Sequence, residues 1–252
     1  MIAFPNAKIN LGLNVVEKRQ DGFHNIETVF YPIPTLCDVL EIIENKNTKL
    51  NIYGNTINGN TEDNLVVKAL NIIKKDFNIP DIEIHLLKKI NTGAGLGGGS
   101  ADASFMLKLL NEKFQLNISN EDLKKYASKL GSDCAFFIDN KPSYATGKGD
   151  ILELIDIPVL EKFKIRVITP EIHVSTAQAY SKIIPHKNKE NIKDILKDSP
   201  STWRDRLHND FEDSVFIDFP ELQEIKNSLY NEGAIYASMT GSGSAFFGIF
   251  ED

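Results

Sequence analysis

Hydrophobic and polar residues alternate most regularly near the N-terminus. Over residues 7–15 the odd-numbered positions are apolar, and the even-numbered ones are Lys8, Asn10, Gly12 and Asn14. A period of two is that of a β-strand with one face against a core. The pattern therefore predicts a strand on which Lys8 and Asn10 lie about 7 Å apart on the polar face. That face is either solvated, as on most strands, or part of a binding site beside the small Gly12.

The hydrophobic spacing changes to that of a helix over residues 63–77. Its buried stripe is expected to contain Leu65, Val66, Ala69, Leu70 and Ile73. Ser119 with Asp122, and Ser175 with Gln178, have the spacing of capping boxes and predict two further helices, over residues 119–129 and 175–183. Pro220 and Gly233 bracket a helix over residues 220–231.

Short runs rich in β-branched and aromatic residues predict the strands. They are expected at residues 23–31, after the Asp21-Gly22 turn, and at 39–43, 49–53, 82–86, 143–149, 163–167, 235–239 and 245–250. Residues 186–200 are polar and predict a solvated loop with a short helix. The pattern alone supports an α+β fold in two parts, with a boundary near Pro158.

A glycine-rich loop joins the strand at 82–86 to the next helix. Residues 91–104 read NTGAGLGGGSADAS and contain five glycines within seven residues. Glycine permits positive φ and lets a ligand approach the backbone closely. Ser100 is expected as the N-cap of the helix, and Asp102 as an acid in its first turn. The backbone N–H groups of such a strand, loop and helix bind phosphate well.

Two other known motifs fit this loop only in part. Gly93, Gly95 and Gly98 satisfy the G-x-G-x-x-G dinucleotide fingerprint, but no βαβ unit opens there. A P-loop is excluded because Gly99 stands where that motif has lysine. A dinucleotide-dependent oxidoreductase and a nucleotide-binding module without activity therefore remain as alternatives to an enzyme that transfers phosphate.

An acid and a second glycine-rich turn extend the phosphate hypothesis. Asp133 directly precedes the apolar run 135–138 and is either a helix cap or a carboxylate used in chemistry, of which the residues alone favour the cap. Residues 240–244, TGSGS, offer further backbone donors or form a simple hairpin loop. A phosphate loop, a lysine and a carboxylate together indicate phosphoryl transfer to an alcohol.

Composition and charge limit the classes of partner and the cellular location that we expect for this protein. The 252 residues have a net charge of -7, which disfavours nucleic acid and anionic membranes as partners. Two cysteines are too few for a disulfide framework, and no apolar run has the length of a membrane span. We expect a cytoplasmic protein without a signal sequence, monomeric or weakly dimeric, that acts on a small molecule.

Three segments together resemble the GHMP kinase superfamily: PNAKINLGLNV at 5–15, TGAGLGGGSADAS at 92–104 and MTGSGSAFF at 239–247. Within it, residues 7–30 resemble the opening of bacterial 4-diphosphocytidyl-2-C-methyl-D-erythritol kinases. The likeness continues through DNLVVKA, LGSDCAFF, YATGKGD and NDFE, in order along nearly the whole chain. Homoserine and mevalonate kinases, the nearest alternatives, lack the segment DGFHNIETVF.

The resemblance implies a two-domain α+β fold. A ribosomal-protein-S5-like α/β domain would occupy residues 1–157, and a ferredoxin-like domain residues 158–252. It also implies ATP-dependent phosphorylation of the 2-hydroxyl of a cytidine-diphosphate-linked methylerythritol in the non-mevalonate pathway to isoprenoids. ATP is expected with Mg²⁺, held chiefly by phosphates and water because no acidic cluster identifies protein ligands.

Residue roles follow from the same resemblance. Asp133 becomes the base and Lys8 its partner, which overturns the preference for a cap. The expected ATP-binding residues are Asn64, Lys88, Gly93, Gly95, Leu96, Gly97, Gly98, Gly99 and Ser100. The expected substrate-binding residues are Asn10, Phe23, His24, Tyr180, Thr240, Gly241 and Ser242. Phe23 stands where the family often has tyrosine, and Asn91 where it commonly has proline.

Overall fold

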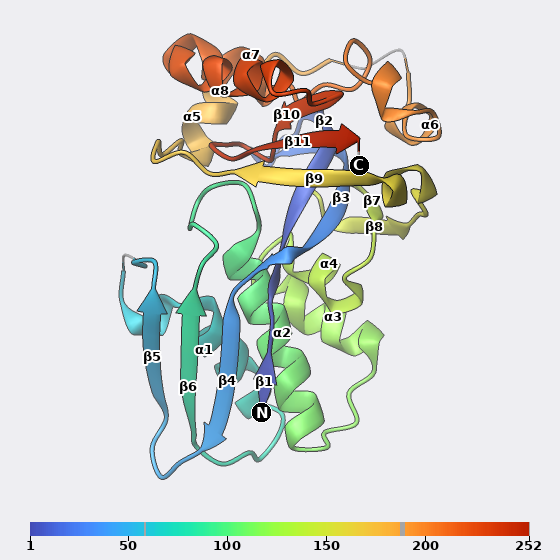
Figure 1. Ribbon diagram of the computed structural model, residues 1–252. Coiled ribbons are helices and arrows are strands. Elements are labelled where there is room, and N and C mark those ends of the chain that lie inside the picture. Colours follow the sequence, from blue (N-terminus) through green and yellow to red (C-terminus); the bar gives the residue numbers. More distant parts are fainter. Residues whose placement is uncertain (58, 187–189, 252) are drawn as a thin grey trace. The chain divides into compact units, whose positions relative to one another are not determined.

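The chain forms two compact units and crosses between them several times. The computed structural model describes residues 1–57, 59–186 and 190–251 (Figure 1). Unit 1 consists of Met1–Lys8, Pro32–Thr92 and Gly97–Lys141, and unit 2 of Ile9–Tyr31, Gly93–Leu96 and Pro142–Asp252. This division differs from the single boundary expected between residues 157 and 158, because each unit is assembled from separated segments. Residues 58, 187–189 and 252 lie outside the described residues, and 187–189 belong to the stretch expected as a solvated loop.

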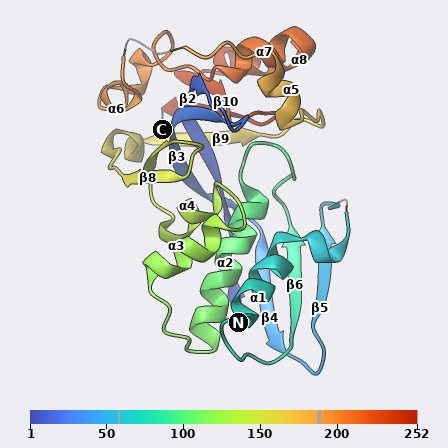
Figure 2. The same ribbon diagram turned by 180° about the vertical axis from the view of Figure 1, so that it is seen from behind.

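Unit 1 is a four-stranded sheet with helices on one face. The strand order is β1-β4-β6-β5, antiparallel except for the parallel pair β5 and β6. Helices α1 and α2 cover one face of the sheet, and α3 and α4 pack beside α2 (Figures 1 and 2). The bounds are β1 Ile2–Ala3, β4 Val39–Glu44, β5 Lys49–Gly54, β6 Ile82–Lys88, η1 Thr61–Asp63, α1 Leu65–Lys74, α2 Gly98–Lys113, α3 Asn120–Ser128 and α4 Cys134–Asp139.

The core of unit 1 lies between the sheet and these helices. Alternate residues of β4 and β6 are buried there, among them Leu40, Ile42 and Ile84. From α1, the predicted stripe is buried except for Leu65, which is partly exposed. Burying one such aliphatic side chain contributes about 1.5–3 kcal/mol. The helix begins at Leu65, later than predicted, because Asn64 caps it by accepting a hydrogen bond from the Val66 N–H, and it ends at Lys74 instead of the predicted residue 77.

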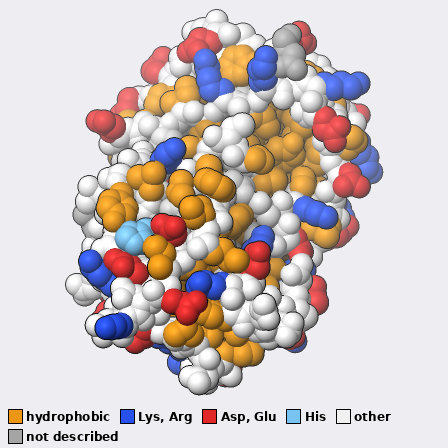
Figure 3. Space-filling model, turned by 60° about the horizontal axis from the view of Figure 1, so that its bottom comes forward, with side chains coloured by type: hydrophobic (Ala, Val, Ile, Leu, Met, Phe, Trp, Pro, Cys, Tyr) orange, Lys and Arg blue, Asp and Glu red, His pale blue; other side chains and the backbone are white. Residues whose placement is uncertain are grey.

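The other face of the sheet in unit 1 carries mixed side chains. Tyr53 donates or accepts a hydrogen bond with His85 there, and Ile2 and Ile43 are exposed on the same face by register. On the side of the molecule drawn in Figure 3, hydrophobic side chains form separate patches among acidic and basic ones.

Unit 2 contains two sheets, ordered β2-β3-β7-β8 and β10-β11-β9, and the shorter helices. Strands β2 and β3 begin or end in unit 1. The bounds are β2 Asn6–Lys18, β3 His24–Cys37, β7 Ser143–Thr146, β8 Ile151–Leu154, η2 Pro158–Lys162, β9 Phe163–Ile168, α5 Thr176–Ser181, α6 Ile192–Ile195, η3 Pro200–Thr202, α7 Phe211–Asp218, α8 Pro220–Asn231, β10 Tyr236–Met239 and β11 Phe246–Glu251.

The core of unit 2 joins the beginning and the end of the chain. Leu13 and Val15 of β2 pack in one buried cluster with Phe211 of α7 and Phe246 of β11. The supposedly polar face of β2 is buried as well, since Lys8, Asn10 and Asn14 are at most 3% exposed. A solvated face is therefore wrong for this strand.

The predicted helix ends are confirmed in part. Ser119 accepts a hydrogen bond from the Asp122 N–H, and the capping box of Ser175 is formed. Ser100 is not an N-cap, however, because α2 already begins at Gly98, after Gly97 in the left-handed conformation. A residue with positive φ ends the preceding loop at no steric cost only if it is glycine.

Candidate functional site

Lys8 and Asp133 form an ion pair in unit 1. The Lys8 Nζ lies 3.5 Å from the Asp133 Oδ2, and the side chains are 4% and 28% exposed. Asp133 occupies the position before α4 but makes no capping hydrogen bond. Its Oδ1 accepts a hydrogen bond from the Ser132 hydroxyl. The cap interpretation is therefore wrong, and the carboxylate faces the lysine while part of it remains open to solvent.

Burial acts on the lysine of this pair. It lowers the pKa of Lys8, and the charge and hydrogen bonding of Asp133 oppose that shift. A partly exposed carboxylate beside an ammonium is able to accept a proton from a nearby hydroxyl.

The start of α2 lies against the same lysine. Gly97 has φ +71°, and a Cβ added there would come within 3.1 Å of the Lys8 Cγ and 3.0 Å of the Phe137 ring. Glycine thus lets the beginning of the helix approach the ion pair. The first-turn N–H groups, from Gly98 to Ser100, have no partner within the helix and are suited to a phosphate. Unit 1 therefore brings together a helix start suited to a phosphate, a lysine and a carboxylate.

In unit 2 the tip of the glycine loop contacts the final glycine turn. Gly95 has φ +79°, and a Cβ there would lie 2.1 Å from the Thr240 carbonyl oxygen. The Thr240 hydroxyl is 3.3 Å from the Gly95 carbonyl oxygen and accepts a 3.0 Å hydrogen bond from the Asn10 N–H. The Asn10 amide also donates to the Thr28 hydroxyl. Three residues expected to bind ligands thus share one buried network.

Two aromatic rings expected around the substrate base contact each other. The rings of His24 and Tyr180 stack with centroids 4.7 Å apart, and Phe211 meets Tyr180 edge-on. Burial, together with the charge of Lys18, lowers the pKa of His24, so its ring is neutral at pH 7. Rings this close leave no space for a base between them, so a sandwiched base requires Tyr180 to move away from His24.

Comparison with known proteins decides the family. The GHMP kinase N-terminal domain matches residues 64–141, and the GHMP kinase C-terminal domain matches residues 188–252. The 4-diphosphocytidyl-2-C-methyl-D-erythritol kinase of Bacteroides thetaiotaomicron is 54% identical over 255 residues, which cover 100% of this chain and 92% of that protein. The chain belongs to the GHMP kinases.

Further comparisons agree with that family. The kinase of the same name from Cytophaga hutchinsonii is 48% identical over 99% of this chain and 92% of its own length. A crystal structure of 4-(cytidine 5'-diphospho)-2C-methyl-D-erythritol kinase superposes with a TM-score of 0.85 at 30% identity, covering 99% of this chain and 90% of that one. A homoserine kinase structure from Cytophaga hutchinsonii, with a TM-score of 0.64 at 18% identity, shares the fold. The family and fold class expected from the sequence are confirmed.

Two residues expected at the adenine are already engaged within this GHMP kinase. The Lys88 ammonium binds Asp38 and lies 2.7 Å from the Asp102 Oδ2, with all three side chains buried. Asn64 uses its side-chain oxygen to cap α1. Their contact with adenine stays a prediction, as do the other ligand-binding roles.

Asp102 makes the stability of this GHMP kinase depend on pH. Burial raises its pKa from 3.8 to about 7, against the attraction of Lys88 and with the help of the Asp38 charge. The folded state therefore keeps a proton that the unfolded state loses, and the free energy of unfolding falls as the pH rises from about 4 to about 7.

Asp102→Asn should remove this loss. We expect the variant to be more stable than the wild type at pH 8, by at most about 4 kcal/mol, and nearly equal to it at pH 4. Urea denaturation of both proteins at the two pH values measures the difference. A stability difference that is the same at pH 4 and pH 8 would show that Asp102 does not titrate in this range.

The NDFE segment of unit 2 supports the final glycine turn, a role that its sequence did not reveal. The Asn209 amide donates to the carbonyl oxygens of Met239 and Gly241, at 2.8 and 2.9 Å. Glu212 accepts from the Met239 N–H and from the Ser238 hydroxyl. The family resemblance of this segment was the only signal for it.

Lys148 was also missed by the sequence reasoning. Its Nζ lies 4.8 Å from the centre of the Phe23 ring, which is 58% exposed. An ammonium over an exposed ring is a modest cation–π contact. It places a positive charge beside a residue expected to bind the diphosphate-linked base, where the family segment YATGKGD supplies the lysine.

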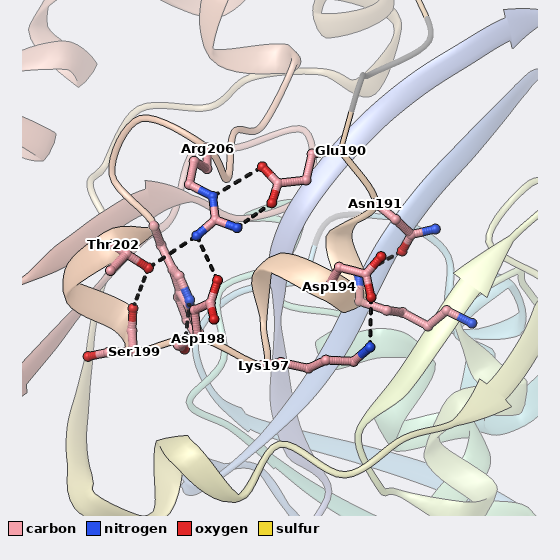
Figure 4. Close-up of polar contacts among 10 residues, drawn as sticks. Glu190, Asn191, Asp194, Lys197, Asp198, Ser199, Thr202 and Arg206 are labelled. Atoms are coloured by element: carbon pink, nitrogen blue, oxygen red, sulfur yellow. Dashed lines mark hydrogen bonds and ion pairs between the residues drawn. The ribbon is translucent and has the colours of Figure 1, made fainter.

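A separate cavity of unit 2 has no evident role in this chemistry. It measures about 370 Å³ and is lined by Ile155, Asp156, Ile157, Asn191, Lys193, Asp194, Leu196 and Lys197. In its wall Lys197 binds Asp194, and nearby Arg206 binds Glu190 and Asp198 (Figure 4). Because each of these charged side chains already has a partner of opposite charge, the cluster points to no ligand.

The described residues contain neither a cluster of metal-binding side chains nor a membrane-spanning helix. No group of three or more His, Cys, Asp or Glu side chains in residues 1–57, 59–186 and 190–251 is arranged to hold a metal ion. Over the same part of the chain, no helix combines the length and apolar character needed to cross a membrane.

Proposed function

We propose that this chain is a kinase that transfers the γ-phosphoryl group of ATP to the 2-hydroxyl of 4-diphosphocytidyl-2-C-methyl-D-erythritol. The reaction belongs to the non-mevalonate route to isoprenoid precursors. The observation that carries the substrate is the 54% identity, over the full chain, to a kinase of that name. The Lys8–Asp133 pair beside the start of α2 supplies the groups that the reaction needs.

Asp133 accepts the proton of the substrate hydroxyl as the bond from oxygen to phosphorus forms. Lys8 holds the Asp133 carboxylate in an ion pair and stabilises the negative charge that develops on the phosphoryl oxygens. The N–H groups at the start of α2 bind the phosphates. Mg²⁺ bound with ATP would neutralise phosphate charge, and since the described residues offer no acidic cluster, phosphate oxygens and water would be its ligands.

The substrate residues belong to unit 2. The neutral ring of His24 has one donor and one acceptor nitrogen, which suits the edge of a cytosine. Tyr180 would stack on the base after separating from His24, and Phe23 would cover it where the family often has tyrosine. Asn10 and the turn Thr240, Gly241 and Ser242 would contact the remainder of the substrate.

Release of ADP by the purified protein with Mg-ATP tests the substrate. We expect rapid ADP release with 4-diphosphocytidyl-2-C-methyl-D-erythritol and little with the corresponding methylerythritol phosphate, because His24 and Tyr180 bind only the cytidylylated form. His24→Ala should raise the KM of the cytidylylated substrate about tenfold or more, the loss of roughly one good contact. Homoserine and mevalonate serve as controls. Faster ADP release with either of them, or none with any alcohol despite tight ATP binding, would overturn the proposed substrate.

A further inference from the structure

The two ends of the glycine loop meet in unit 1. Strand β6 ends at Lys88, and α2 begins at Gly98. A Cβ added to Gly98 would lie 2.8 Å from the Ile90 Cγ2 and 3.4 Å from the Lys88 Nζ. The side chains of Ile90 and Lys88, where the chain enters the loop, thus pack against Gly98, where the chain leaves it, and the Lys88 ammonium lies at this junction.

One buried carboxylate binds three donors at the loop entry. Asp38, directly before β4, accepts hydrogen bonds through Oδ1 from the N–H groups of Lys89 and Ile90, at 2.6 and 2.9 Å. Its Oδ2 binds the Lys88 ammonium. Asp38 therefore fixes both the backbone and the side chain where the chain turns out of β6.

The second carboxylate ties the loop exit to the same ammonium. Asp102, in the first turns of α2, accepts a hydrogen bond of 2.7 Å from Lys88 through its Oδ2. The Lys88, Asp38 and Asp102 side chains are at most 3% exposed. One ammonium thus connects the start of β4, the end of β6 and the start of α2.

A contribution to the stability of the fold does not by itself explain why these three charged side chains are buried together. Taking an ion out of water costs several kcal/mol, and buried ion pairs often stabilise a fold no better than hydrophobic residues of similar size. The Asp102 Oδ1 also lacks a hydrogen-bond partner among the described residues. What the cluster does provide is a fixed distance between the two ends of the loop.

We propose that Asp38, Lys88 and Asp102 form a clamp that holds the ends of the glycine loop and so sets its affinity for a nucleoside triphosphate. Lys88 is then a positioning residue that acts on the phosphates through the loop backbone and does not read the base. The inference rests on the proposed function only in taking the loop to bind ATP. A contact between Lys88 and adenine would affect only the binding of adenine nucleotides, whereas the clamp would affect the binding of any nucleoside triphosphate.

Nucleotide affinity of Lys88→Met tests the clamp. Binding of adenylyl and guanylyl imidodiphosphate, each with Mg²⁺, is measured by titration calorimetry on wild type and variant. We expect both dissociation constants to rise by about tenfold or more and by the same factor, because a displaced loop binds any triphosphate less well. A rise for the adenine nucleotide alone would establish a base contact and overturn the clamp, as would unchanged affinity for both.

Calorimetry also separates a clamp from a residue that only supports folding. If Lys88 serves stability alone, the fraction of binding-competent protein falls while the dissociation constants stay unchanged, which contradicts the proposal. Asp38→Asn is the second variant should Lys88→Met not fold, because it keeps an acceptor for the backbone N–H groups and removes the charge that holds Lys88. Asp38→Asn should raise the dissociation constants of both nucleotides by the same factor, about threefold or more, which is a smaller loss of affinity than for Lys88→Met.

Lys74→Met is the matched control. Lys74 also lies in unit 1 and binds an aspartate, Asp81, at 2.6 Å, but this pair is partly exposed and touches neither end of the loop. The affinity of the Lys74→Met variant for both nucleotides should equal that of the wild type. A wild type that binds both nucleotides but releases no ADP with the methylerythritol substrate would overturn only the proposed substrate, whereas a wild type that binds neither would overturn both proposals.

Discussion

Replacement of Asp133 by asparagine is expected to lower kcat by about 10³-fold or more while the dissociation constant for ATP changes less than about threefold. An amide has nearly the same shape as a carboxylate but cannot accept the proton of the substrate hydroxyl. The side chain is partly exposed and makes no capping hydrogen bond, so the change should leave α4 intact. Steady-state ADP release gives kcat, and titration calorimetry gives the affinity for ATP.

Asp139→Asn is the control for this experiment. Asp139 is the last residue of the same helix, and its carboxylate forms an ion pair of 2.7 Å with Lys124 of α3, also in unit 1. It should keep wild-type turnover, since loss of one partly exposed ion pair costs only about 0–1 kcal/mol of stability. Turnover of Asp133→Asn close to the wild-type value would remove Asp133 from the mechanism.

Lys8→Met is expected to reduce kcat by about 10²–10³-fold with little loss of stability. Methionine fills a similar volume without the ammonium that stabilises charge on the phosphoryl oxygens. Removing one partner of a fully buried ion pair is usually costly because the other charge stays unpaired. Here the Asp133 side chain is 28% exposed, so water can solvate it after the change. Steady-state kinetics and thermal denaturation of the same preparation measure the two effects.

The two readouts distinguish a catalytic lysine from a structural one. A lysine that only supports the fold would give a lower melting temperature and a smaller active fraction, with the turnover of the remaining active enzyme unchanged. A higher KM with unchanged kcat would assign Lys8 to substrate binding, contrary to the proposed role.

Local signals in the sequence predicted local structure well. Helix α8 runs from Pro220 to Asn231 as predicted, because proline at the start and glycine past the end act within a few residues. The cap at Ser175 is correct for the same reason. The start of α2 was displaced by three residues because several glycines close together each allow the left-handed conformation that ends the loop, and only the structure identifies Gly97 as the N-cap.

The alternation of apolar and polar residues could not predict contacts between segments that are distant in the sequence. The face of β2 that carries Asn10 has the composition of a solvated surface, yet the Thr240 hydroxyl, 230 positions away, donates a hydrogen bond to the Asn10 side chain. Nothing within a few residues of Asp133 distinguishes a cap from a base, so its pairing with Lys8 came from family resemblance. The same resemblance assigned Lys88 to the adenine pocket. The sequence could not reveal that Lys88 is buried between Asp38 and Asp102, because this arrangement depends on three separated elements.

The interleaved cores also determine when each unit can fold during synthesis. Every segment of unit 1 has been made once residue 141 has left the ribosome, so its core and the Lys8–Asp133 pair can form early. Leu13 and Val15 are made more than 200 residues before their packing partner Phe246. Such sequence-distant contacts form slowly, so the apolar side chains of β2 stay uncovered at least until Phe246 has been made. During that interval β2 is exposed to aggregation, and a chaperone that binds apolar segments would protect it.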